Sequence, residues 1–190
     1  LHVDIAQWII DQCGPGQGPT TIKPVMVEAR VPFDDNGNPT LDDRYNTPHR
    51  FTVQVNYPND VLMEITSEGR NGILVEGTQG RIFVNRGTIA GKPIEELENN
   101  PLPGGWLEDM YGGPVVEHVN NFFDCIASRK KPASDVLSHV ASINTCHLSN
   151  IAIRLNRLIQ WDAATQTIKD DAVASAMLKR DFRKGYEIEL

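Results

Sequence analysis

The sequence has few cysteines and no long apolar run. Its three cysteines, Cys13, Cys125 and Cys146, lie far apart and form no C-x-x-C pair. This argues against a disulfide framework and against a structural zinc site. No apolar run approaches the roughly 18 residues that cross a bilayer, so no transmembrane helix is predicted. The chain also opens without an initiator Met or a signal peptide, and we expect it to be a fragment of a longer protein.

Basic residues are outnumbered, with 18 Lys and Arg against 25 Asp and Glu and a net charge of −7. Nucleic acid binding draws most of its affinity from a basic surface, so the composition argues against a nucleic acid partner. The densest basic cluster, Arg129-Lys130-Lys131, is better explained as a helix C-terminus, where positive charge is favourable. The 190 residues, 40% of them hydrophobic, are enough for one domain with its own core.

The first half of the chain reads as one helix followed by strands. Alternation of period two predicts a hairpin from Phe51–Tyr57 and Val61–Ile65. Further strands are predicted at 21–31, 72–76 and 81–85, after a helix at 3–10. A phosphate loop follows a strand and opens a helix. The run Gly14-Pro15-Gly16-Gln17-Gly18 instead follows a helix, so it is interpreted as a helix stop. Residues 33–48 form a long polar loop.

The second half changes to helical spacing. Helices are predicted at 94–98, from Pro114 to about 126, from a cap at Ser134 or Asp135 to about 157, and at 171–179, with short strands at 158–161 and 165–169. Consecutive hairpins flanked by helices predict an α+β fold: an open, mostly antiparallel sheet with helices packed on one face. Leu62 and Leu74 indicate that the other face is not purely polar, and we expect that face to dimerise.

Side chains with catalytic potential are scattered along the sequence. The histidines, at positions 2, 49, 118, 139 and 147, show no metal-binding spacing. His147 has the best functional case, because Asn144 and Asn150 share its helix face at three-residue spacing. A structural histidine is the alternative. From the chemistry alone, the sequence predicts a soluble α+β domain without a self-contained catalytic set.

Several stretches together resemble a known family. They are His2-Val-Asp-Ile-Ala-Gln-Trp8, Val75-Glu-Gly-Thr-Gln-Gly80 with Arg81-Ile-Phe-Val-Asn-Arg86, Phe122-Phe-Asp-Cys-Ile126, Cys146-His-Leu-Ser-Asn-Ile-Ala-Ile-Arg-Leu155, Trp161-Asp162 and Arg183-Lys-Gly-Tyr186. In this order they resemble the C-terminal α/β domain of bacterial members of the glucose–fructose oxidoreductase / inositol dehydrogenase / MocA family. The resemblance covers essentially the whole chain.

The resemblance implies a preceding Rossmann domain, which is not part of this chain. That domain would carry the NAD(P) fingerprint and a Glu-Lys-Pro motif with a catalytic lysine. Gly91-Lys92-Pro93 lacks the glutamate, so Lys92 is interpreted as a surface lysine. We therefore expect residues 1–190 to be a substrate-binding and oligomerisation domain that binds no cofactor of its own.

A second catalytic element of the family resembles D-x-x-x-H-x-x-D-x-x-x-W. Asp4 and Trp8 match its last two members, but Leu1 stands where the histidine is expected. Either the fragment begins inside the motif with a cloning residue, or this member departs from the pattern. The resemblance makes His2 a candidate for proton transfer, and Asp4 a residue that orients or caps.

The family implies hydride transfer between a sugar or polyol carbon and the nicotinamide of NAD or NADP. This domain would supply a substrate pocket on one side of its sheet and an oligomer interface on the other. Candidate substrate contacts, assigned by position and with Asp4 included, are Asn144, His147 and the loop at Tyr45-Asn46-Thr47. Two alternatives stay open: NAD-dependent glycoside hydrolysis, and a non-enzymatic sugar-binding or dimerisation module.

Overall fold

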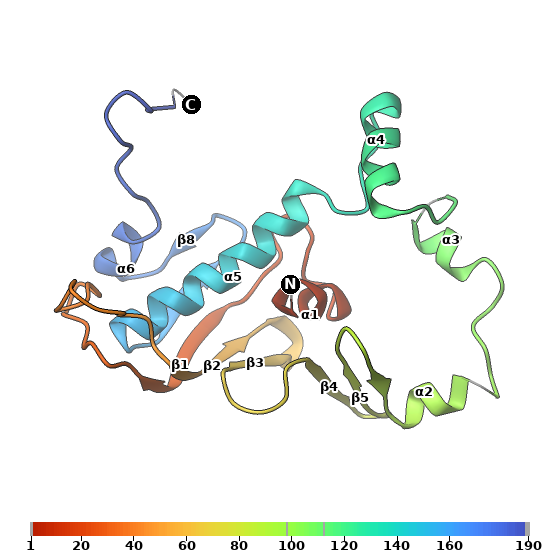
Figure 1. The fold of residues 1–190 in the computed structure, drawn as a ribbon, viewed down its shortest axis with the longest axis horizontal. Coiled ribbons are helices and arrows are strands. Elements are labelled where there is room, and N and C mark those ends of the chain that lie inside the picture. Colours follow the sequence, from red (N-terminus) through yellow and green to blue (C-terminus); the bar gives the residue numbers. More distant parts are fainter. Residues whose placement is uncertain (1, 98, 112, 189–190) are drawn as a thin grey trace. The chain divides into compact units, whose positions relative to one another are not determined.

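The structure of the chain, a computed structural model, describes residues 2–97, 99–111 and 113–188. They divide into two compact units (Figure 1). One comprises Val3–Gly69 and Val140 onward, and the other comprises Arg70–His139, to which His2 is also assigned. Each unit is built around its own antiparallel sheet, so the predicted α+β class is confirmed. The strands form two sheets where we expected one.

The first unit is a five-stranded sheet with a long helix on one face. Its strands run in the order β3-β2-β1-β7-β8, every pair antiparallel. Their bounds are β1 Thr21–Glu28, β2 Arg50–Asn56, β3 Leu62–Thr66, β7 Ile159–Asp162 and β8 Thr167–Ile168; the helices are α1 His2–Ile9, α5 Val136–Leu155 and α6 Ala172–Ala176, with a 3-10 turn at Pro58–Asp60. Figure 1 shows α5 lying along this sheet.

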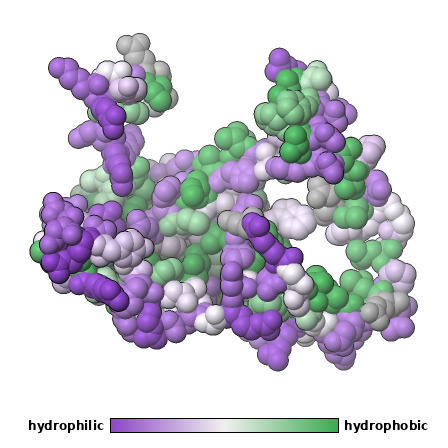
Figure 2. Space-filling view, in the orientation of Figure 1, coloured by the Kyte–Doolittle hydropathy of each residue, from purple (hydrophilic) through white to green (hydrophobic). Residues whose placement is uncertain are grey.

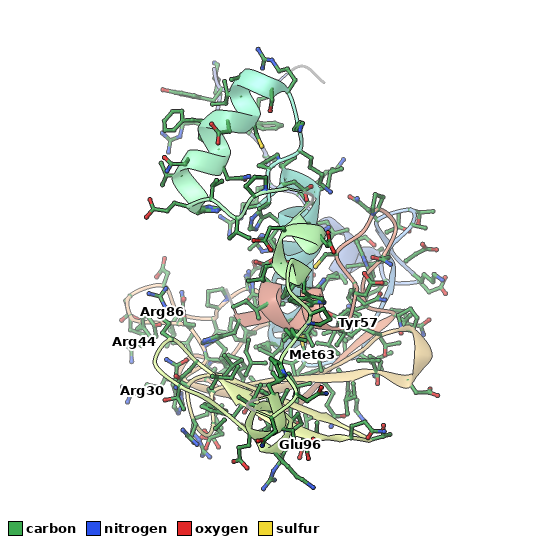
Figure 3. The ribbon with its side chains drawn as sticks, turned by 90° about the vertical axis from the view of Figure 1, so that its right-hand side faces the viewer. Arg30, Arg44, Tyr57, Met63, Arg86 and Glu96 are labelled. Carbon is green, nitrogen blue, oxygen red and sulfur yellow. The ribbon has the colours of Figure 1, made fainter. Side chains whose placement is uncertain are left out.

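The core of this unit lies between the sheet and α5. Val53 and Val55 of β2 are fully buried with Ile22 of β1, and Ile22 is paired with Val55 in the ladder. Tyr57 and Met63, labelled in Figure 3, belong to the same core. Helix α5 contributes its buried face, which is Ser142, Thr145, Leu148, Ser149, Ile151, Ala152 and Ile153. Period-two alternation in β2 therefore places its odd-numbered valines inside, as expected for a half-buried strand.

The opposite face of the sheet is open to solvent in this unit. A row crosses it where Lys23 is paired with Gln54 and Gln54 with Glu64. The register of β1 shifts between Pro24 and Met26, and Val25 at this bulge is 54% exposed, as is Leu62 on β3. The open face is thus mixed, with opposite charges at the two ends of a polar row and apolar side chains beside it.

The glycine-rich segment after α1 is a helix stop, as predicted. Asp11 adopts a left-handed conformation with φ 54°, and Gln12 N donates to Gln7 O at 2.9 Å, closing the helix end. Gly14 N is satisfied within the loop by Gln17 Oε1 at 2.6 Å.

The first part of the long polar loop is ordered by hydrogen bonds. The Oδ1 atom of Asp34 accepts from Asn36 N at 2.9 Å and from Asn38 N at 2.7 Å, and the bond from Asn38 is the largest factor holding the pKa of Asp34 below its usual value. The Nε of Arg154, near the end of α5, donates to Gly37 O at 2.6 Å. This contact attaches the loop to the C-terminal end of α5.

The second unit contains a three-stranded sheet and three short helices. Strands β4 Ile73–Gly77, β5 Gly80–Val84 and β6 Ile89–Ala90 pair in sequence order, and the helices are α2 Lys92–Leu97, α3 Trp106–Tyr111 and α4 His118–Ser128. Gly91, with φ 140°, joins β6 to α2, and a Cβ on it would overlap the carbonyl oxygen of Arg81. Lys92 is an exposed lysine 3.6 Å from Glu96, in agreement with its interpretation.

Two features of this unit differ from the prediction. Helix α4 begins at His118 instead of Pro114, because Glu117 still has extended backbone angles of φ −56° and ψ 144°. Helix α3 and strand β6 were not predicted, since both are too short to establish a period. The cap at Asp135 is confirmed, with Leu137 N donating to its Oδ1 at 3.0 Å. All helices in the described ranges are too short or too polar to span a membrane.

Candidate functional site

The best-defined polar site lies where α1 meets α5. The hydroxyl of Ser142 on α5 donates to Asp4 Oδ1 on α1 at 2.7 Å. Ser142 is only 6% exposed, so the bond forms where water competes weakly. A hydrogen bond to an ionised carboxylate is stronger than one between neutral groups. It therefore holds one side of α1 against α5.

His2 does not share this face. It is exposed and lies two positions before Asp4 in the same helix. Residues i and i+2 of a helix point roughly 160° apart around the axis. The two α1 candidates therefore act on different sides of the helix, and a direct proton relay between them does not follow from this arrangement.

Hydroxyl groups continue along the buried face of α5. Thr145 and Ser149 lie one and two turns beyond Ser142, and Ser149 Oγ donates to Thr145 O at 2.8 Å. Thr145 Oγ1 is 3.4 Å from the hydroxyl of Tyr57, the residue that follows β2. Gln7 of α1 is fully buried and donates to Gln12 O at 3.0 Å. This seam is thus a polar interior, built from small side chains on α5 that let neighbouring elements approach closely.

The thiol and the phenol along this face are kept neutral. Burial raises the pKa of the half-buried Cys146 thiol, and the nearby Asp4 carboxylate raises it further. Burial likewise raises the pKa of Tyr57. A nucleophilic cysteine needs a lowered pKa, so Cys146 is a packing thiol. The seam positions α1 and offers no activated nucleophile.

The predicted polar stripe lies on the outer face of α5. His147 and Asn150 are exposed and Asn144 is half-buried, whereas Leu148, Ile151, Ala152 and Ile153 of the same helix are buried. Their amide and imidazole groups can donate and accept hydrogen bonds with hydroxyl groups. The stripe is therefore available to a ligand and does not line an internal cavity of this unit.

The remaining predicted contacts lie in the loop between β1 and β2, whose earlier part is bound to the C-terminal end of α5. Tyr45 is 74% exposed and Asn46 is half-buried, in the loop whose earlier part Arg154 holds. Ser142 and Arg154 are twelve positions apart, which is about 18 Å along a helix. The structure therefore brings Asp4 to α5 but does not gather all six predicted side chains into one pocket.

The glycine-rich turn after α1 does not fit a dinucleotide. The pyrophosphate of NAD(P) is bound by a glycine-rich turn at a helix N-terminus. The glycine-rich turn here follows the C-terminus of α1, whose carbonyl groups repel anions, and its Gly14 N–H is occupied by Gln17. Nor do three His, Cys, Asp or Glu side chains in the described ranges gather closely enough for a metal ion. No reaction step can be derived through either group from these residues.

Sequence reasoning missed Ser142 and the rest of the hydroxyl seam. A signal was present, because Ser142, Thr145 and Ser149 recur at spacings of three and four, which places small hydroxyl groups on one helix face. The partner of Ser142 in α1, Asp4, lies 138 positions away. No local pattern could have identified Asp4 as that partner.

Comparison with known protein families gives a match. The pattern described as "Oxidoreductase family, C-terminal alpha/beta domain", of the Gfo/Idh/MocA group, matches residues 22–188. Helix α1, with His2 and Asp4, precedes the matched range. Comparison with curated proteins and with solved structures gave no match. The open antiparallel sheets and their helices agree with the family description, and the chain belongs to the Gfo/Idh/MocA oxidoreductase family as its C-terminal alpha/beta domain.

Proposed function

We propose that this chain is the substrate-binding and oligomerisation domain of an NAD(P)-dependent oxidoreductase that acts on a hydroxyl group of a sugar or polyol. The observation that carries the proposal is the family match over residues 22–188. A separate dinucleotide-binding domain, N-terminal to this one, would hold the cofactor, since the residues described here do not fit it. The work of this chain would be to bind the substrate and to join subunits.

The anchoring of α1 supports a role in positioning the substrate. Asp4 is held by Ser142 at 2.7 Å, so α1 has a fixed rotation on α5. That rotation leaves the exposed His2 free to meet a ligand. Imidazole can exchange protons near neutral pH, which suits it to take up or return the proton of a substrate hydroxyl. Asn144 and His147 on α5 would contribute hydrogen bonds to other hydroxyl groups, with Tyr45 and Asn46 as further candidate contacts.

The open face of the five-stranded sheet supports the subunit-joining role. Lys23 and Glu64 lie at the two ends of one polar row. A two-fold axis through Gln54 would bring each charge opposite its counterpart on a second copy. Val25 and Leu62, both 54% exposed, would be covered in the same contact.

The enzymatic proposal is tested on the natural coding sequence and its protein. Reading the codons upstream of Leu1 should reveal a G-x-G-x-x-G motif and a Glu-Lys-Pro motif within about 150 residues, the usual size of such a domain. The full-length protein should reduce NAD or NADP with a sugar or polyol from a panel. The isolated 190-residue chain should not bind NAD in calorimetry. Tight NAD binding by this chain, or an upstream region without either motif, would contradict the proposal.

The oligomer interface is tested by charge insertion on the sheet. Leu62→Asp should shift the sedimentation coefficient towards the monomer. Leu41→Asp is the matched control, because Leu41 is also exposed, at 45%, but lies in the loop after β1. Equal sedimentation of both variants and the parent chain would exclude the open face as an interface.

A further inference from the structure

Helix α4 carries an uncovered apolar stripe along its whole length. Val119, Phe122, Phe123 and Ile126 are 62%, 54%, 61% and 47% exposed, and none of the described residues of α4 is buried. Their spacing of three, four and seven places all four on one helix face. Figure 2 shows hydrophobic side chains gathered on this helix. An isolated helix of 11 residues is marginal in water, so α4 requires a partner for this face.

The other sides of α4 are either contacted by a neighbouring segment of the same unit or polar. The segment after the helix folds back along it, with Ala133 N donating to Asn121 Oδ1 at 2.9 Å. Asn120 and Asp124 are exposed polar groups on a third side. A hollow of about 280 Å³ lies beside the stripe, lined by His118, Val119, Asn121, Phe122, Phe123, Pro132 and Ser134. The apolar stripe and this hollow thus form one surface.

The stripe is complementary to itself when reversed. Consider an antiparallel pair of α4 helices with a two-fold axis between Phe122 and Phe123. A residue that lies before the axis in one copy then faces the residue that lies equally far after the axis in the other copy. Val119 then faces Ile126 of the second copy, and Phe122 faces its Phe123. Each contact occurs twice, as an isologous interface requires. Two phenylalanines per copy would form aromatic contacts across the axis.

Charge at the ends of α4 selects the antiparallel direction. Glu117 precedes the helix and is exposed, whereas Arg129 and Lys130 follow it and are exposed. Antiparallel pairing places Glu117 of one copy at the same end as Arg129 and Lys130 of the other. A parallel pair would place like charges together and align the helix dipoles unfavourably. We propose that the α4 stripe, defined as Val119, Phe122, Phe123 and Ile126, binds the α4 stripe of a second copy of this chain in antiparallel orientation.

The size of the stripe sets the strength of this contact. Two phenylalanines and two aliphatic side chains, each about half exposed, would bury about 400 Å² per copy. Stable dimers bury about 800 Å² per partner. The α4 contact is therefore a weak, concentration-dependent interface. It uses other residues than the sheet face and does not depend on the oxidoreductase proposal.

The proposal is tested on the 190-residue chain by sedimentation velocity over about a hundredfold range of concentration. Phe123→Asp should raise the dissociation constant of this contact by more than about tenfold. Asn120→Asp, on another side of α4, should leave it unchanged. Circular dichroism would verify that both variants fold. The sheet variant Leu62→Asp should remove a different association step, so failure of one interface is distinguishable from failure of the other.

A charge exchange tests the orientation independently. Glu117→Arg and Arg129→Glu should each weaken association, and the double variant should restore it towards the parent value. Identical sedimentation of Phe123→Asp and the parent chain would overturn the proposal. So would a chain that stays monomeric throughout the range while its α4 amides are protected from exchange, because the stripe would then be covered within the monomer. Absence of rescue in the double variant would overturn the antiparallel arrangement.

Discussion

Ser142 and Asp4 are joined by a hydrogen bond of 2.7 Å between the serine hydroxyl and the carboxylate. The bond links the helix that backs the sheet to the helix that carries His2, although the two residues are 138 positions apart. Ser142 belongs to α5, and Leu148 and Ala152 of the same helix are part of the hydrophobic core. The packing of the core therefore sets the position of Asp4. A residue near the chain start thus takes its orientation from the C-terminal half.

Removing the hydroxyl should weaken this link. Ser142→Ala removes the hydrogen bond that a buried hydroxyl donates to the Asp4 carboxylate, and should lower the free energy of unfolding by about 1–3 kcal/mol. Ser128→Ala, which removes an exposed hydroxyl from α4, should change it by less than about 0.5 kcal/mol. Urea titration measures both. Equal stability of the two variants would show that the Asp4 contact contributes nothing.

Neutralising Asp4 should make Cys146 more reactive. The carboxylate adds to the effect of burial in raising the pKa of the thiol, so Asp4→Asn should lower that pKa and increase the thiolate fraction above pH 8 or so. Alkylation by iodoacetamide, followed in a background with Cys13 and Cys125 replaced by Ser, should become faster. Asp11→Asn is the control, because Asp11 is exposed at the far end of α1. A slower or unchanged rate in Asp4→Asn would contradict the assignment.

The ion pair between Arg157 and Asp171 should make the stability of the fold decrease at acid pH. Both guanidinium contacts are 2.8 Å, and Arg157 is the first cause that holds the pKa of Asp171 below its ordinary value of 3.8. A carboxylate with a lowered pKa stabilises the fold above 3.8, and this stabilisation is lost as the pH falls through the lowered pKa. Asp171→Asn retains an oxygen to cap α6 but loses the charge.

The stability difference between the parent chain and Asp171→Asn should therefore be constant near neutral pH. It should shrink below pH 3.8 and vanish when the native carboxyl is protonated. Thermal melts at a series of pH values measure it. A difference that persists unchanged in strong acid would show that the aspartate acts through its shape and not through its charge.

Lysine substitutions in β2 should separate the two faces of the sheet. Val53 and Val55 are fully buried, so Val53→Lys places an unpaired charge in the core and should cost at least about 3 kcal/mol of folding free energy. Gln54→Lys points outward between Lys23 and Glu64, whose opposite charges offset each other, and should cost less than about 0.5 kcal/mol. Chemical denaturation provides the comparison. Similar losses in both variants would mean that the register of β2 is wrong.

Gly91 should not tolerate a side chain. Its φ of 140° lies outside the range that other residues favour, and a Cβ would overlap the Arg81 carbonyl. Gly91→Ala should destabilise the β5–β6–α2 region by about 1–3 kcal/mol or more. Gly104→Ala, which meets nothing within 4 Å, should be neutral. Amide exchange of β5 reads out the local effect, and equal protection in both variants would contradict the close approach at Gly91.

Periodicity and turn residues predicted most helices and strands. They failed where an element was too short to show a period or where the apolar pattern ran on beyond the element. Period-two alternation placed β2 and β3, and the glycines after Gln12 placed the end of α1, because each depends on neighbouring residues. The start of α4 was wrong by four positions, since Val115 and Val116 continue the apolar pattern although the backbone is still extended at Glu117. Strand β6 has two residues, too few for any period.

The sequence by itself determined the α+β class, the family and the amphipathic character of α4, because composition, periodicity and ordered motifs are properties of neighbouring residues. Only the tertiary structure decided that Asp4 meets Ser142, that the stripe around His147 faces outward, and that Gly37 of the long polar loop binds Arg154 of α5. Those outcomes depend on how α5 rotates as it packs its apolar face on the sheet. A helix can adopt that rotation only when the whole core is assembled, so no single segment specifies it.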